Sequence, residues 1–135
     1  MGFEILSINM RGGTYGTGST SAKVDWILAA AALGTIGVIV LTEVWGGRES
    51  LFQVRDLFLR GGFRGEILPG KVKGRAAMLA PRQCSGVIVL YKEALFRIGA
   101  VCRHAALRGG FTPEQGRSLA LPLTRKSDDS AITVV

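Results

Sequence analysis

Two short apolar segments in the first third of the chain each end at a polar residue, and a helical pattern separates them. Residues 5–8 lead directly into Asn9, and residues 38–42 lead directly into Glu43. Short apolar runs of this kind are typical of buried strands. Two parallel strands joined by a helix place their carboxyl ends at the same edge of a sheet. The order of these segments therefore predicts that a carboxamide and a carboxylate lie side by side at one edge.

The segment between the two strands has the periodicity of a helix. Its apolar residues recur on one face, at Val24, Ile27, Leu28 and Ala31. A serine or threonine within residues 19–21 is predicted to cap the start of the helix, and Gly34 is predicted to end it. We expect Trp26 to lie in the core as well.

A membrane span over residues 26–41 is a weaker alternative. A span needs roughly 20 apolar residues, and this run is shorter, contains glycines, and lies between Asp25 and Glu43. A helix followed by a buried strand explains it better, so we expect no membrane partner. The amino terminus lacks the pattern of a signal peptide. Cys84 and Cys102 are typical of free thiols in a reducing compartment, so we expect an intracellular location, with the nucleus as one candidate.

The rest of the chain continues the alternation of helix and strand patterns. A second helix is predicted over residues 49–60, ending at Gly61 and Gly62. Residues 64–83 are predicted to be irregular and basic, and residues 103–117 to form a loop. Further strands are predicted at residues 86–91, 96–101, 118–123 and 131–135, the last two joined by a polar turn.

The composition fits one globular domain with a polyanionic partner. Of the 135 residues, 47% are hydrophobic and 20% are charged, so we expect a single domain over residues 1–135. The net charge is +7 and the pI is about 10.1, which favours nucleic acid or an acidic membrane surface. The basic segment at residues 64–83 is suited to follow a nucleic-acid backbone.

Taken in order, these segments resemble the endonuclease/exonuclease/phosphatase family, and within it the endonucleases of non-LTR retrotransposons. The matching segments are spread along nearly the whole chain, at residues 5–12, 38–43, 85–92, 116–121 and 131–135. The resemblance implies an α/β fold, the N-terminal half of a four-layer α/β sandwich. In that fold two mixed β-sheets pack face to face with helices outside. The family's later motifs do not occur before the chain ends at residue 135, so we expect a C-terminally truncated domain.

The resemblance also implies a site for metal-dependent cleavage of phosphoester bonds. Family members use Mg²⁺, for which Mn²⁺ can substitute. By resemblance, Glu43 is the metal-binding carboxylate, and Asn9 beside it helps to hold the metal, the phosphate or a catalytic partner. Because Glu43 follows an apolar run, we expect it to be half-buried, where an unpaired carboxylate is costly. His104 has no matching motif and receives no role.

Arg11 and Trp45 are weaker candidates for substrate binding. Arg11 follows Asn9 and is placed to reach a phosphate, although a solvated loop arginine fits equally. Trp45 lies just past Glu43 and is placed to stack on a base, although packing in the core is the default interpretation.

These residues lead to a main hypothesis and several alternatives. The main one is Mg²⁺-dependent nicking of DNA, with DNA favoured over RNA and only the first part of the site in this chain. One alternative is an inactive remnant that at most binds nucleic acid. Another is a family member that acts on a phospholipid or phosphoinositide. A half-sandwich would also leave a sheet face uncovered, through which the chain could self-associate.

Overall fold

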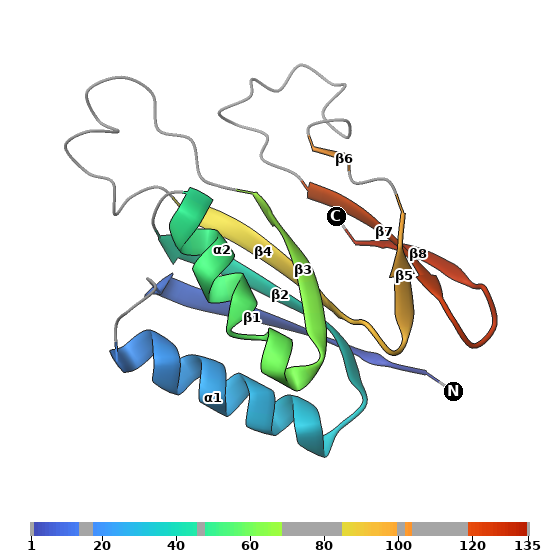
Figure 1. Ribbon diagram of the computed structural model, residues 1–135, viewed down its shortest axis with the longest axis horizontal. Helices are drawn as coiled ribbons and strands as arrows, with labels where there is room; N and C mark the ends of the chain where they lie inside the picture. Colours follow the sequence, from blue (N-terminus) through green and yellow to red (C-terminus); the bar gives the residue numbers. More distant parts are fainter. Residues whose placement is uncertain are drawn as a thin grey trace.

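A computed structural model describes residues 2–13, 18–45, 48–68, 85–99, 102–103 and 119–134 of the chain (Figure 1). In chain order the elements are β1 (Glu4–Gly13), α1 (Gly18–Leu33), β2 (Ile36–Trp45), α2 (Arg48–Asp56), the 3-10 turn η1 (Leu59–Gly61), β3 (Phe63–Leu68), β4 (Ser85–Lys92), β5 (Phe96–Ile98), β6 (Cys102–Arg103), β7 (Leu119–Arg125) and β8 (Ala131–Val134).

The first sheet has the strand order β1-β2-β4-β3. Strands β1 and β2 run parallel, and β4 pairs antiparallel with both β2 and β3. The parallel pair confirms the predicted strand–helix–strand unit. Strand β2 lies inside the sheet, and both of its faces are covered: Ile39 and Leu41 belong to the core under the helices, and Val38 belongs to the core between the sheets. This explains why its sequence is continuously apolar.

Helices α1 and α2 cover the same face of the first sheet (Figure 1). The buried residues of α1 are Thr20, Val24, Ile27 and Ala31, and Leu28 is partly buried against them, as the periodicity predicted. The helix ends at Leu33, just before Gly34. It begins at Gly18, however, so residues 19–21 lie within its first turn and the predicted cap is wrong. No helix among the described residues is long and apolar enough to cross a membrane.

Trp26 is 65% exposed, which contradicts the prediction that it lies in the core. It follows Asp25 on the outward side of α1, while the adjacent Ile27 is only 1% exposed. The outward side of α1 carries apolar residues as well, so the hydrophobicity of Trp26 alone could not show that it faces outward. Packing of α1 on the first sheet determines which of its apolar residues are buried.

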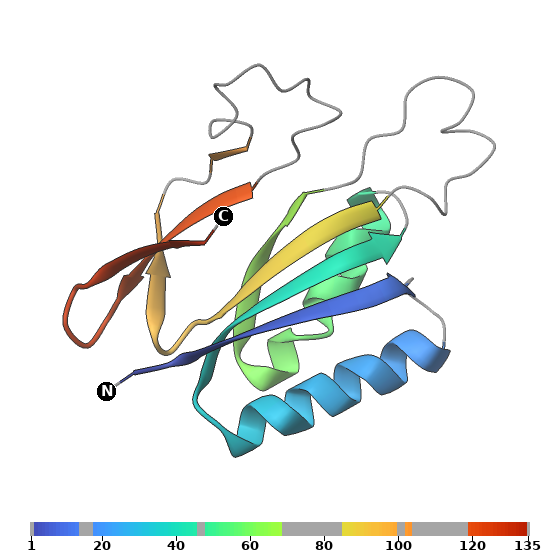
Figure 2. The same cartoon turned by 180° about the vertical axis from the view of Figure 1, so that it is seen from behind.

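A second sheet packs on the opposite face of the first (Figure 2). Strand β7 pairs antiparallel with β5, β6 and β8. Its buried residues Leu121 and Leu123 join Phe96 of β5 against the first sheet. The described residues therefore form a helix layer and two face-to-face sheets, which confirms the predicted fold class.

Some element boundaries differ from the predictions. Strand β1 extends to Gly13, because Asn9 and Gly13 both pair with β2. Residues 64–68, predicted to be irregular, form part of β3. The cause is pairing with β4 from a distant part of the chain, which the local composition of Arg64, Gly65 and Glu66 does not reveal. Residues 69–84 lie outside the described ranges.

The second helix and the later strands are close to the predictions. Helix α2 ends at Asp56 and the turn η1 follows, with its cap at Gly62 in the left-handed region at φ 80°. Strand β5 covers only Phe96–Ile98 of the predicted strand over residues 96–101. The predicted pair at the end of the chain is present as β7 and β8. The loop at residues 104–117, with His104, and both cysteine side chains lie outside the described parts.

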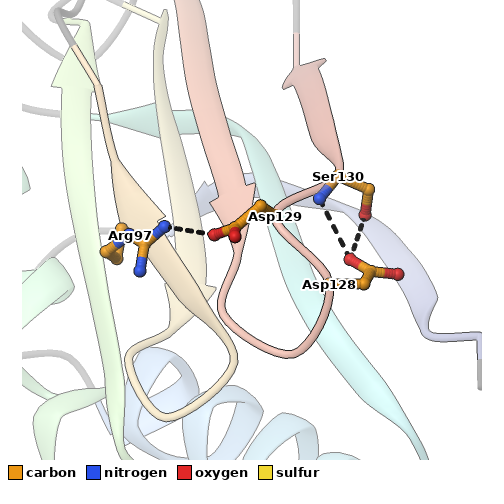
Figure 3. A network of polar contacts seen from close by, with 4 residues as sticks. All are labelled: Arg97, Asp128, Asp129 and Ser130. Carbon is orange, nitrogen blue, oxygen red and sulfur yellow. Dashed lines mark hydrogen bonds and ion pairs between the residues drawn. The ribbon is translucent and has the colours of Figure 1, made fainter.

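The turn between β7 and β8 is held by polar contacts (Figure 3). The backbone N–H of Ser130 donates to Oδ1 of Asp128 at 3.0 Å, and its hydroxyl donates to the same oxygen at 2.6 Å. Arg97 of β5 donates to Asp129 at 2.7 Å. These contacts tie β5 to the hairpin formed by β7 and β8.

Candidate metal–phosphate site

The carboxyl ends of β1 and β2 lie side by side at one edge of the first sheet, which we call the rim. The Cα of Asn9 is the register partner of the Cα of Thr42, and Glu43 follows Thr42 directly. Neighbouring strands lie about 4.8 Å apart. The fold thus brings Asn9 and Glu43 to the same edge, in the order that the sequence predicted.

The backbone at the rim is irregular on both strands. Arg11 has a φ of 48° and Glu43 a φ of 53°, which places both non-glycine residues in the left-handed region. On β1, residues 10–12 stand against the single residue Glu43 between the register pairs Asn9–Thr42 and Gly13–Val44. Such bulges redirect side chains and often lie next to functional sites. The strain at Arg11 and Glu43 makes the rim a candidate site on structural grounds.

The left-handed conformation decides where the Glu43 side chain lies. Ile39 and Leu41 face the core under the helices, so strict alternation would direct Glu43 into the same core. Instead Val44 enters that core and is 0% exposed. Glu43 is exposed, which corrects the half-buried place expected for it. The bulge therefore presents the carboxylate to solvent and avoids burying an unpaired charge.

The Asn9 side chain is oriented by its own turn. Its Oδ1 accepts a hydrogen bond from the backbone N–H of Arg11 at 2.8 Å. The carboxamide oxygen is fixed as the acceptor because the backbone N–H can only donate. Among the described residues this is the only hydrogen bond of that side chain. Within the described part of the chain, the two N–H donors and one oxygen lone pair of this exposed carboxamide have no partner.

Lys23 of helix α1 contacts the backbone of the rim, and this residue was not identified from the sequence. Its Nζ donates to the main-chain carbonyl of Met10 at 2.8 Å, from helix α1. The Thr42 hydroxyl makes a longer contact, at 3.5 Å, with the carbonyl of Ile8. Lys23 is the only basic residue of helix α1, which was the available signal. Its contact needs the packing of α1 under β1, which no local pattern contains.

Arg11 and Trp45 flank the rim. Arg11 is exposed, and it makes no ion pair within the described residues. Trp45 is half-buried at the end of β2, where it is the register partner of Ser85. Among the described residues, the rim thus combines the carboxylate of Glu43, the carboxamide of Asn9, the guanidinium of Arg11 and the ring of Trp45.

The side chains at the rim fit a magnesium ion better than a zinc ion. No group of three or more His, Cys, Asp or Glu that could hold a metal occurs among the described residues. Zinc sites require three or four such ligands. Mg²⁺ keeps several waters and is held by one or two carboxylates together with substrate phosphates. An exposed carboxylate and an exposed carboxamide at the ends of neighbouring strands match this second pattern.

Comparison with known proteins identifies the fold. No protein family matches the sequence, and no curated protein does. The human Nocturnin catalytic domain with bound sulfate has a TM-score of 0.63 at 12% identity, over 97% of this chain and 48% of that one. D. rerio TDP2 complexed with a single-strand DNA product has a TM-score of 0.59 at 12% identity, over 97% and 43%.

A third solved structure is similar to the same extent. ANGEL2, a 2′,3′-cyclic phosphatase in complex with adenosine-2′,3′-vanadate, has a TM-score of 0.60 at 17% identity, over 97% of this chain and 39% of that one. All three are enzymes of one fold. The chain therefore has the endonuclease/exonuclease/phosphatase fold and spans less than half the length of these three structures.

Proposed function

We propose that this chain carries the first part of a site for Mg²⁺-dependent phosphodiester hydrolysis, and that the reaction is the nicking of DNA by a retroelement-type endonuclease. The observation that carries the proposal is the left-handed backbone at Glu43. It presents a carboxylate to solvent at the rim, beside Asn9 on the neighbouring strand. The retroelement assignment rests on the ordered sequence segments alone.

In this proposal Glu43 holds the metal ion. A bound Mg²⁺ would neutralise the charge that develops on the phosphate. Asn9 donates its N–H groups to a phosphate oxygen, because its Oδ1 is already engaged by Arg11. The Arg11 guanidinium binds a second phosphate oxygen, and Trp45 stacks on a neighbouring base.

Lys23 acts through the backbone of the rim. Its bond to the Met10 carbonyl fixes the turn that orients Asn9, so the carboxamide is oriented before substrate binds. The attacking water must also lose a proton to a base. We assign that role to none of the described residues.

The choice of nucleic acid is supported by charge and by the similar structures. The net charge of +7 favours a polyanion. The three similar proteins were solved with sulfate, with a single-strand DNA product and with adenosine-2′,3′-vanadate. Each of these ligands carries an oxyanion. The DNA product supports DNA as the substrate of this chain over a lipid.

The proposal is tested first by metal binding. Mn²⁺ binding to the full chain is measured by electron paramagnetic resonance, with Mg²⁺ as competitor. Glu43→Gln removes the charge at nearly constant volume and should weaken binding by roughly 100-fold. Glu49→Gln, an exposed residue in the first turn of α2, is the matched control and should bind as the wild type does. Equal binding by the wild type and Glu43→Gln would refute the metal assignment.

Nicking of supercoiled plasmid then separates catalysis from mere binding. Divalent-dependent nicking that Glu43→Gln lowers by roughly 100-fold, about 2.7 kcal/mol of transition-state stabilisation, would support the enzyme.

The presence of only one carboxylate in the proposed ligand set favours a second candidate, a chain that binds nucleic acid without turnover. That candidate predicts salt-sensitive DNA binding and no nicking.

A further inference from the structure

A cavity lies at the end of the first sheet opposite to the rim. Its volume is about 470 Å³, and its walls come from the start of β1, the α1–β2 connection, the β4–β5 turn and the β7–β8 turn. Figure 1 shows these segments together near the amino terminus. Strand β2 starts at the cavity with Ile36 and ends beyond Glu43, so its length separates the cavity from the rim.

The walls of the cavity are largely apolar and well packed. Phe3, Ile36, Leu95 and Phe96 line it. The rings of Phe3 and Phe96 meet edge to face, with centroids 4.9 Å apart. Phe96 is 2% exposed, so this wall is fixed by the core between the two sheets. A preformed apolar cavity of this size is typical of small-molecule sites.

The charged side chains that line the cavity are basic, and the carboxylate of Glu4 lies beside it, where it accepts a hydrogen bond from the lining Thr35 at 3.2 Å. Lys92, Arg125 and Lys126 line it, and no acidic residue is among the described lining residues. The Arg125 guanidinium lies 5.4 Å from the centroid of the Phe3 ring. Its Nη1 is 3.3 Å from Asp128, which offsets part of its charge. Within the described ranges, neither lysine ammonium has a carboxylate partner, and the Lys92 ammonium lies 5.9 Å from the centroid of the Phe63 ring.

We infer that this cavity binds a small amphipathic anion, with an apolar body the size of an aromatic ring system or a medium-length acyl chain and one carboxylate, sulfonate or phosphate head. The aromatic and aliphatic walls take the body, and the basic residues take the head. Charge complementarity selects this occupant over a neutral apolar molecule. The inference is independent of the proposed nuclease site, because the two sites lie at opposite ends of β2.

The probe is anilinonaphthalene sulfonate, an aromatic body with a single sulfonate, whose fluorescence rises on binding. Gly34 lines the cavity, and a Cβ there would meet only the Ala30 carbonyl at 4.0 Å, so Gly34→Leu adds bulk without a backbone clash. It should weaken dye binding at least about tenfold. Gly18→Leu makes the same change at an open position at the other end of α1 and should leave binding unchanged. Equal dye binding by the two variants would overturn the inference.

The requirement for an anionic head is tested by competition on the wild-type chain and by charge-reversal variants. Decanoate should displace the dye at concentrations at least about tenfold lower than decanol does. Phenyl phosphate in the same assay distinguishes an aryl phosphate from an acyl carboxylate as the better occupant. Lys126→Glu should weaken dye binding about fivefold, while Arg48→Glu, at the start of α2, should not. Displacement by decanol as effective as that by decanoate would overturn the anionic part of the inference.

Discussion

The backbone at Glu43 lies in a conformation that an L-residue adopts at a cost. Its φ of 53° is in the left-handed region, which disfavours residues with a Cβ by roughly 1–2 kcal/mol. Glycine would fit this conformation without strain. The chain nevertheless has a glutamate here, and its carboxylate is exposed at the rim. We interpret the strain as the cost of presenting a ligand where strand alternation would bury it.

Two substitutions of Glu43 should therefore differ in their free energy of unfolding while both lose metal binding. Glu43→Gly should raise the free energy of unfolding by about 1 kcal/mol over Glu43→Ala, because glycine relieves the strain. Both variants should lose Mn²⁺ binding. Urea denaturation measures the first effect, and paramagnetic resonance measures the second.

The same pair of substitutions at Glu49 provides the control. Glu49 lies in helix α2, where glycine is less stable than alanine by about 1 kcal/mol. At Glu49 the alanine variant should therefore be more stable than the glycine variant, whereas at Glu43 the glycine variant should be the more stable one. An alanine variant more stable than the glycine variant at Glu43 would contradict the role assigned to the backbone.

At the level of elements, the β7–β8 hairpin depends on an ionised carboxylate in its turn. Hydrogen bonds from the Ser130 hydroxyl and from its backbone N–H hold the pKa of Asp128 below its usual value. Arg125 lowers that pKa as well. A carboxyl with a lowered pKa in the folded chain stabilises the fold above its unfolded-state pKa. That contribution is lost as the pH falls through the folded-state pKa.

Acid should therefore weaken the wild-type chain more than a variant without this carboxylate. Below about pH 4, the usual pKa of an aspartate, the urea midpoint of the wild type should fall more steeply than that of Asp128→Asn. Ser130→Ala removes one of the two donors and should give an intermediate dependence on pH. Identical acid profiles for the wild type and Asp128→Asn would contradict the assignment.

Element boundaries and burial followed the sequence only where the signal was local. The apolar face of α1 and the buried strand β2 were predictable from periodicity. Strand β3 was not, because its pairing with β4 comes from residues distant in sequence. The exposure of Trp26 was missed because α1 carries apolar residues on both of its sides.

At the level of the whole molecule, Phe96 joins the two sheets. It is 2% exposed in the core between them, in contact with Phe3. A Cβ at Gly37 of β2 would lie 2.9 Å from its ring, so the ring packs directly on the first sheet. Losing this ring would remove a contact that the second sheet needs to stay docked.

Phe96→Ala should accordingly lower the free energy of unfolding by about 3–5 kcal/mol. Leu95→Ala is the neighbouring control: Leu95 is 40% exposed, and its loss should cost less than about 0.5 kcal/mol. Hydrogen exchange of Phe96→Ala should show protection lost first in β5, β7 and β8. Uniform loss over both sheets would contradict the joining role of Phe96.

The sequence by itself determined the strand–helix–strand unit, the interior position of β2 and the meeting of Asn9 with Glu43 at one edge. These features follow from hydrophobic periodicity and from the geometry of parallel strands, both of which are encoded locally. Only the tertiary structure decided that Glu43 is exposed through a left-handed backbone, that Lys23 reaches the Met10 carbonyl, and that three basic residues line part of a cavity at the far end of the sheet. Each of these depends on contacts between segments far apart in the chain, and such contacts form only when the elements pack.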